Sequence, residues 1–259
     1  MISFTLPSLL CLILLLAGPA NSSPTPAMPT VYLAGDSTMA KGIQRWGVFL
    51  QYSLNIPVIN AAISGRSARS YTNEGRFQEI ADVVKPGDWV IIEFGHNDGG
   101  SLVPVDNGRT DCPGDGAETC YTVYDGKPEV AYSFNYYIET AGMMFMAKGA
   151  NVIISSQTPN NDHASGYFRY TPSPFVWYSK ESADSIRATF VDHGLYTGHA
   201  YHLLGKTTVE SCYQIDNVHT SSEGADYVAA AFVKALLCGH GGLKQHVKNS
   251  TAEVYGDCI

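Results

Sequence analysis

The amino-acid sequence is poor in charge, because only 15% of its 259 residues are Asp, Glu, Lys or Arg. Acidic residues outnumber basic ones by 24 to 16, which gives a formal net charge of −8. A negative field of this kind disfavours nucleic acids and anionic membranes as non-specific partners. It does not exclude an acidic substrate held in a locally basic cleft. The chain shows no internal repeat and no domain linker, so we expect a single domain over residues 30–259.

Several ligand-binding motifs are also missing. The chain has no CxxC pair and no other spacing typical of metal ligands, so we expect no zinc site. Neither GxGxxG nor GxxxxGK[ST] follows the first apolar run of the mature chain. Their absence argues against a phosphate- or nucleotide-binding α/β protein.

Basic residues are absent from residues 1–8, which precede an apolar run, LLCLILLLAG, at residues 9–18. This run is too short to span a membrane comfortably, and small residues follow it. We interpret residues 1–22 as a secretory signal peptide, with cleavage between about residues 20 and 30; an uncleaved anchor is the alternative. The mature protein is then expected outside the cell, free of the membrane. In such a protein, the sequon that begins at Asn249 predicts an N-glycan.

Secretion makes disulfide bonds expected among the five cysteines beyond the signal peptide. Cys112 and Cys120 bracket a glycine-rich acidic loop and form the obvious short-range pair. Cys238 follows the last apolar segment and Cys258 lies next to the C-terminus, so their pairing would tie the tail to the body. Cys212 then remains as a buried free thiol.

Apolar runs and helical periodicity alternate along the chain. We expect strands at residues 31–35, 57–63, 88–94, 151–157 and 189–192, and helices at residues 39–54, 74–84, 130–148, 174–188 and 222–237. The segment 101–128 has almost no periodicity and predicts a long, disulfide-stapled loop. The alternation predicts one parallel sheet with helices on both faces.

Four of the expected strands end in polar signatures: Gly-Asp-Ser, Ser-Gly-Arg, Gly-His-Asn-Asp and Gln-Thr-Pro-Asn-Asn. In a parallel sheet these ends meet at one edge, where ligands bind. Ser37, after the first strand, is a possible nucleophile if a base can reach it. The alternative is that Ser37 or Asp36 only caps a helix.

The segment before the last helix supplies a base for this serine. Asp216 stands three residues ahead of His219, so it can fold back within one turn and hold the imidazole. Alone, this pair would be read as a loop histidine with a capping aspartate, but together with Ser37 it favours a catalytic triad. The natural oxyanion donors are the Ser37 and Gly65 amides and the Asn97 side-chain NH₂.

These blocks together resemble the SGNH (GDSL) hydrolase superfamily, through residues 35–37, Gly65, residues 95–98 and residues 216–219. Within it, the runs YLAGDSTMAK, SGRSARSYTNEGRF, EFGHNDGG, NGRTDC and SSQTPNN resemble fungal rhamnogalacturonan acetylesterases. The similarity extends from Thr30 to the last cysteine.

This resemblance implies a flavodoxin-like, three-layer α/β/α sandwich with a five-stranded parallel sheet. It also implies a secreted serine esterase that removes O-acetyl groups from pectic rhamnogalacturonan through an acetyl-enzyme, without a metal or other cofactor. Ser37 would be the nucleophile, His219 the general base and then acid, and Asp216 the residue that orients His219. The family's disulfides map onto Cys112–Cys120 and Cys238–Cys258. We take a monomer as the default.

Other readings remain open. The chain could be another SGNH carbohydrate acetylesterase, for example on xylan, or a lipase-type esterase, although it has no evident large apolar lid. It could also be a non-catalytic carbohydrate-binding protein on the same fold, although all three triad residues are present.

Charged residues near the expected site have two interpretations each. Arg66 and Arg69 either meet galacturonate carboxylates of the substrate or serve as surface charge and structural ion pairs. Glu93, His96 and Asp98 are more in keeping with shaping the loops by hydrogen bonding than with acid–base catalysis.

Overall fold

The structure is a computed structural model that describes Met1 and residues 28–42, 45–161 and 170–259. A parallel sheet lies at its centre, formed by β1 (Val31–Gly35), β2 (Val58–Asn60), β3 (Trp89–Glu93), β6 (Asn151–Ser155) and β7 (Thr189–Val191). The order is β2-β1-β3-β6-β7, and every neighbouring pair is parallel. The chain therefore runs outward from β1 in one direction and then, from β3, in the other, so the strand order reverses between β1 and β3.

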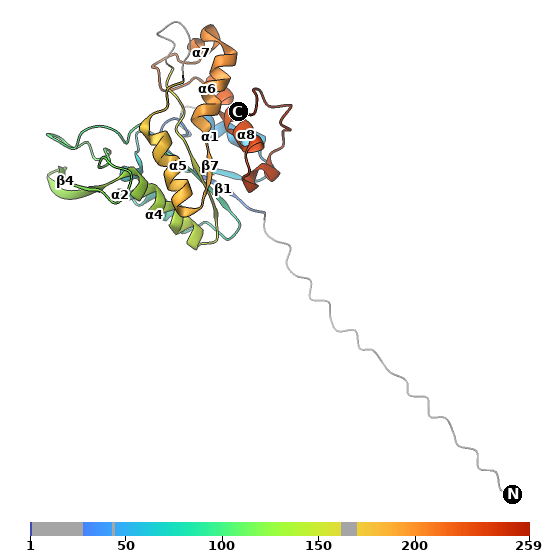
Figure 1. Ribbon diagram of the computed structural model, residues 1–259, viewed down its shortest axis with the longest axis horizontal. Helices are drawn as coiled ribbons and strands as arrows, with labels where there is room; N and C mark the ends of the chain where they lie inside the picture. The colour runs from blue at the N-terminus through green and yellow to red at the C-terminus, as the bar shows by residue number, and fades with distance from the viewer. Residues whose placement is uncertain (2–27, 43–44, 162–169) are drawn as a thin grey trace.

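Helices cover both faces of this sheet (Figure 1). One face carries α1 (Trp46–Ser53), α6 (His193–Leu204), α7 (Lys206–Ser211) and α8 (Ser222–Cys238), with the 3-10 helix η2 (Gly242–His246) after α8. The other face carries α2 (Ala68–Asn73), α3 (Arg76–Ala81), α4 (Phe134–Ala147) and α5 (Pro174–Ile186). The expected three-layer α/β/α architecture with five parallel strands is confirmed.

Side-chain alternation along each strand explains the two cores. Val31 and Leu33 of β1 point into the core beneath α1 and α8, whereas Tyr32 and Ala34 point into the core beneath α2 and α4. Because both faces are covered, β1 is apolar throughout, as expected of a doubly covered parallel strand. On the first face, Trp46 of α1 stacks on Phe232 of α8 with ring centroids 5.1 Å apart.

The expected helix over residues 39–54 is wrong at its start, because α1 begins only at Trp46. Residues after Asp36 form a turn instead, in which the amides of Met39 and Ala40 donate to the Asp36 carbonyl. The helical spacing of apolar residues also begins at Trp46. Residues 43 and 44 lie outside the described residues.

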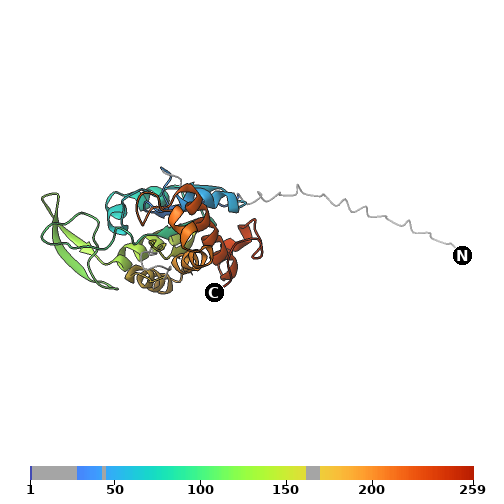
Figure 2. The same cartoon turned by 90° about the horizontal axis from the view of Figure 1, so that it is seen from above.

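The prediction of a loop over residues 101–128 is wrong in its second half. There the chain forms an antiparallel hairpin of β4 (Thr119–Tyr124) and β5 (Lys127–Tyr132), which projects from the body in both views (Figures 1 and 2). Its turn is Asp125-Gly126, with φ of 51° and 73°. An Asp-Gly pair is a strong hairpin signal. Periodicity missed it because the hairpin is mostly exposed and needs no apolar alternation.

The same hairpin corrects the start of the next helix. β5 occupies the first residues of the helix expected at 130–148, so α4 begins at Phe134. Ser133 caps it by accepting a hydrogen bond from the Tyr136 amide.

Three helices were not expected: α2, α6 and α7. Two glycines, Gly194 and Gly198, lower the intrinsic helix propensity of α6. Tertiary packing requires them, because a Cβ at Gly194 would lie 2.5 Å from the Gln157 carbonyl oxygen. Helix propensity therefore did not predict α6, because tertiary packing rather than propensity selects the glycines in it.

The cysteines pair as expected, with Cys112–Cys120 and Cys238–Cys258 bonded and Cys212 buried and free. Residues 2–27, which hold nearly all of the expected signal peptide, lie outside the described residues. Within the described ranges, no helix has the length and apolar character needed to cross a membrane.

A buried ion cluster ties α2 to the hairpin. The guanidinium of Arg69 has no exposed surface and binds Asp106 Oδ2 at 2.7 Å and Glu129 Oε1 at 2.8 Å. It also donates to the Thr110 carbonyl at 2.7 Å. Burial acts to raise the pKa of Asp106, but the hydrogen bonds from Arg69 and Gly108 outweigh it and lower that pKa. The cluster therefore holds a charged carboxylate inside the protein.

We expect Arg69→Met to destabilise the fold by about 3–5 kcal/mol, because it leaves the Asp106 charge buried without its partner. The matched control is Arg76→Met, since Arg76 forms only exposed pairs with Glu74 and Glu79. That substitution should cost far less stability than Arg69→Met, because exposed ion pairs contribute little. Urea unfolding measures both, and equal losses would show that the buried cluster is not a stabilising element.

Candidate active site

Ser37 lies just beyond the carboxyl end of β1. The turn that carries it is shaped by Asp36, whose Oδ1 accepts hydrogen bonds from the Thr38 amide at 2.8 Å and the Thr38 hydroxyl at 2.9 Å. Gly35 lets the chain pass close to β3, because a Cβ there would lie 2.8 Å from the Glu93 carbonyl oxygen. Asp36 thus shapes the turn, and the Ser37 hydroxyl is left for another partner.

That partner is His219, whose Nε2 lies 2.8 Å from Ser37 Oγ. The other ring nitrogen, Nδ1, lies 2.7 Å from Asp216 Oδ2. The second carboxylate oxygen of Asp216 accepts from the amides of Val218 at 2.8 Å and His219 at 2.7 Å. Asp216 and His219 therefore fold onto each other within one turn, and the structure brings all three residues together.

The charge on Asp216 decides which nitrogen of His219 carries the proton. Burial acts to raise the pKa of Asp216, but hydrogen bonds from the His219 side chain and amide and the Val218 amide outweigh it, so the pKa falls to about 2. An ionised carboxylate only accepts hydrogen bonds. The Nδ1 of neutral His219 must then be the donor, which leaves Nε2 free to accept the proton of Ser37.

Two contacts hold the loop that carries His219 against the body. Arg45, buried at the start of α1, donates to the carbonyl of Thr220, the residue after His219. The amide of Asn161, beyond β6, donates to the Asn217 carbonyl at 2.7 Å. Sequence reasoning missed Arg45, because its partner lies 175 positions away and no local pattern marks it.

Two of the expected oxyanion donors, Gly65 and Asn97, lie on the loops that follow β2 and β3, the strands on either side of β1. Gly65 follows β2 with φ of 76°, a conformation that favours glycine. Asn97 follows β3, and its Nδ2 donates to the Arg66 carbonyl at 3.0 Å. Its Oδ1 accepts from Arg109 Nη1 at 3.4 Å. These contacts orient the amide and leave one N–H of Asn97 for another acceptor.

Asp98 joins the two loops that carry Gly65 and Asn97. Its carboxylate accepts from the amides of Ala68 at 2.7 Å and Gly95 at 2.8 Å. Burial raises its pKa to about 7, and the nearby charge of Asp36 acts in the same direction. Asp98 thus shapes the loops by hydrogen bonding, as expected.

Glu93 is also structural. It is buried and accepts from Trp46 Nε1 at 3.1 Å and Ser155 Oγ at 2.5 Å, and it pairs with His193 Nδ1 at 2.8 Å. His96 Nε2 lies 3.4 Å from Thr158 Oγ1. These contacts support a shaping role for both residues.

The two arginines expected near a substrate differ in position. Arg66 is partly exposed and pairs with Glu74 at 3.0 Å. Arg69 cannot meet a substrate, because its guanidinium is fully buried in the cluster with Asp106 and Glu129. The expectation that Arg69 binds substrate is therefore corrected to its alternative, a structural ion pair.

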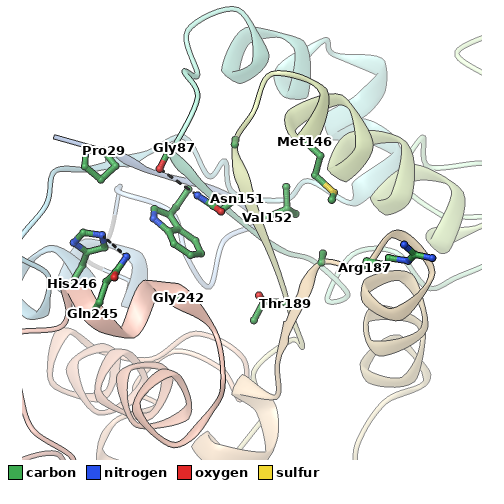
Figure 3. Close-up of a pocket in the computed structure, with 13 residues that line it drawn as sticks. Pro29, Gly87, Met146, Asn151, Val152, Arg187, Thr189, Gly242, Gln245 and His246 are labelled. Atoms are coloured by element: carbon green, nitrogen blue, oxygen red, sulfur yellow. Dashed lines mark hydrogen bonds between the residues drawn. The ribbon is translucent and has the colours of Figure 1, made fainter. Parts of the chain in front are cut away.

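A separate cavity of about 470 Å³ lies far from these residues (Figure 3). Its wall includes Pro29, Gly87, Asn151 and Thr189, which precede or begin strands of the sheet. It therefore opens at the amino end of the sheet, opposite Ser37. Its polar groups contact one another, as in the 3.3 Å hydrogen bond between Gln245 and His246.

A serine in contact with a histidine–aspartate pair, at the carboxyl edge of a parallel sheet, is the arrangement found in serine hydrolases. The chain belongs to the GDSL-like lipase/acylhydrolase family, which residues 31–232 match. The rhamnogalacturonan acetylesterase of Emericella nidulans is 52% identical to it over 236 residues, which cover 91% of this chain and 95% of that protein.

Solved structures share the fold at lower identity. A Bacillus subtilis protein superposes with a TM-score of 0.64 and 21% identity, over 81% of this chain and 56% of that one. A variant of an acetyl xylan esterase from Geobacillus stearothermophilus superposes with a TM-score of 0.55 and 18% identity, over 80% of this chain and 94% of that one.

We expect Asp216→Asn to lower kcat/KM about 10³–10⁴-fold, because an amide no longer fixes the His219 tautomer. Initial rates on an aryl acetate measure this, with Asn217→Ala as the exposed neighbouring control. A loss no larger than that of the control would contradict the role of Asp216.

The same variant tests the depressed pKa. Folded Asp216 binds a proton more weakly than the unfolded chain does, so the ionised form stabilises the fold above about pH 4. This contribution is lost as the pH falls through about 2. We expect the stability advantage of wild type over Asp216→Asn to shrink across that window in thermal melts; an advantage independent of pH would contradict it.

Proposed function

We propose that the chain removes O-acetyl groups from rhamnogalacturonan. The observation that carries the chemistry is the contact of Ser37 with His219 at 2.8 Å, with Asp216 behind the imidazole at 2.7 Å. The substrate class is supported by the 52% identity to the Emericella nidulans rhamnogalacturonan acetylesterase, which extends over 95% of that protein.

The first half-reaction forms an acetyl-enzyme. His219 Nε2 takes the proton of Ser37 Oγ as this oxygen attacks the acetyl carbonyl carbon. The carbonyl oxygen becomes an oxyanion, which accepts hydrogen bonds from the amides of Ser37 and Gly65 and from Asn97 Nδ2. His219 then donates its proton to the sugar oxygen, which leaves as a free hydroxyl while the acetyl group stays on Ser37.

The second half-reaction regenerates the enzyme. A water molecule gives a proton to His219 Nε2 and attacks the acetyl carbon, and the same donors hold the new oxyanion. Collapse of this intermediate returns the proton to Ser37 Oγ and releases acetate. Throughout, the ionised Asp216 stabilises the positive charge on His219.

We also propose that the protein is secreted after removal of residues 1–22, that it carries an N-glycan at Asn249 and that it acts as a monomer. The two disulfides support an oxidising compartment. Asn249 follows η2 on a partly exposed segment, which suits a glycan.

We expect wild type to release acetate faster from acetylated rhamnogalacturonan than from acetylated xylan, and Ser37→Ala to reduce release by at least about 10⁴-fold. Ser211→Ala is the matched control, since Ser211 is exposed and its hydroxyl donates to the Thr208 carbonyl. Preference for xylan would overturn the substrate assignment alone. Retained activity in Ser37→Ala would overturn the nucleophile.

Loss of an oxyanion donor is a separate test. We expect Asn97→Ala to lower kcat about 10²–10³-fold with a smaller change in KM, because the oxyanion exists only during the reaction. Stopped assays over a range of ester concentrations separate the two parameters. A rise in KM with unchanged kcat would place Asn97 in ground-state binding instead.

A further inference from the structure

A second cavity, of about 340 Å³, adjoins the proposed oxyanion donors. Gly65 forms part of its wall, together with Arg66, Glu74, Arg109 and Tyr124. Arg109 also reaches the other donor, since its Nη1 lies 3.4 Å from Asn97 Oδ1. A group held in this cavity would therefore lie next to a reacting acetyl ester.

Two arginines line this cavity, Arg66 and Arg109, and they differ in their partners. Arg66 is neutralised by Glu74, with Nε 3.0 Å from Oε1. Among the described residues, no carboxylate lies within ion-pair distance of Arg109, although the protein has a formal net charge of −8. Its side chain is half-buried and, within the part of the chain that the structure describes, makes one long hydrogen bond, to Asn97, which leaves most of its donors for a ligand.

The loop that presents Arg109 is rigidly built. The amides of Arg109 and Thr110 donate to Asn107 Oδ1 at 2.8 and 3.0 Å. The amide of Gly108 donates to Asp106 Oδ1 at 2.8 Å, and Asp106 is itself held by the buried Arg69. The ion cluster of Arg69 thus anchors the loop from beneath.

The hairpin also contributes to the wall of this cavity. The ring of Tyr124, at the end of β4, packs directly on Gly108, where a Cβ would lie only 2.4 Å from Tyr124 Cζ. Tyr124 is still 42% exposed, so it offers an aromatic surface to the cavity that Arg109 also lines. An aromatic ring next to a free cation suits an acidic sugar.

We propose that this cavity binds a uronate unit of the substrate close to the reacting acetyl ester, with its carboxylate paired to the guanidinium of Arg109. Arginine matches a carboxylate with two parallel hydrogen bonds, and a half-buried site strengthens them. This subsite rests on the proposed function, because the galacturonate units of rhamnogalacturonan supply that carboxylate. It assigns to Arg109 the role that the sequence suggested for its neighbours Arg66 and Arg69.

Inhibition of aryl acetate hydrolysis tests this subsite directly. The probes are a deacetylated rhamnogalacturonan oligosaccharide and the same oligosaccharide with its carboxylates reduced to primary alcohols. We expect wild type to bind the charged probe at least tenfold more tightly than the reduced one, and Arg109→Gln to lose this preference. The control is Arg187→Gln, an exposed arginine at the opposite end of the sheet (Figure 3).

Kinetics on the acetylated substrate give a second readout. Loss of the Asn97 contact lowers the rate on every ester, whereas loss of the carboxylate pair raises KM only for the uronide. We expect Arg109→Gln to lose at least tenfold more kcat/KM on acetylated rhamnogalacturonan than on aryl acetate, mainly through KM, with partial recovery in Arg109→Lys. Equal losses on both substrates would overturn the subsite.

The two proposals fail in different ways. Absence of acetate release from rhamnogalacturonan by wild type, with aryl acetate still cleaved, would overturn the proposed substrate. Equal inhibition of wild type by the charged and reduced probes would overturn the uronate subsite, even with fast release from rhamnogalacturonan.

Discussion

Parallel pairing of β1 with β2 and β3 is the constraint on which the site depends. It brings the ends of three strands to one edge, so Ser37, Gly65 and Asn97 converge although 60 positions separate the first from the last. The reversal of strand order at β1 opens room for a ligand there. The carboxylates of Asp36 and Asp98 then hold the loops in place by accepting backbone amides.

Local patterns predicted most of this arrangement. Ser37 was found because a buried apolar strand ends abruptly in Gly-Asp-Ser, and Asp216 with His219 because their spacing closes within one turn. The central strands β1, β3 and β6 were found because parallel strands covered on both faces are largely apolar. Each of these sequence patterns lies within a few residues of the strand or side chain that it predicts.

Long-range contacts escaped the same reasoning. Arg45, Arg69 and Arg109 have the same side chain, yet one holds the His219 loop, one is buried in an ion cluster and one lies in a cavity without an ion-pair partner among the described residues. Only the distant partners distinguish them. The hairpin was missed for a different reason: its Asp125-Gly126 turn was visible in the sequence, but its exposed strands carry little apolar pattern.

The short closure between Asp216 and His219 has a consequence for how the site can fail. Three hydrogen bonds within four residues join Asp216 and His219 into one locally closed unit. The tertiary structure then has to place His219 Nε2 within hydrogen-bond distance of Ser37 Oγ. Local opening of this loop would therefore separate His219 from Ser37, the proposed nucleophile, in one event, while the hydrogen bond between Asp216 and His219 could persist.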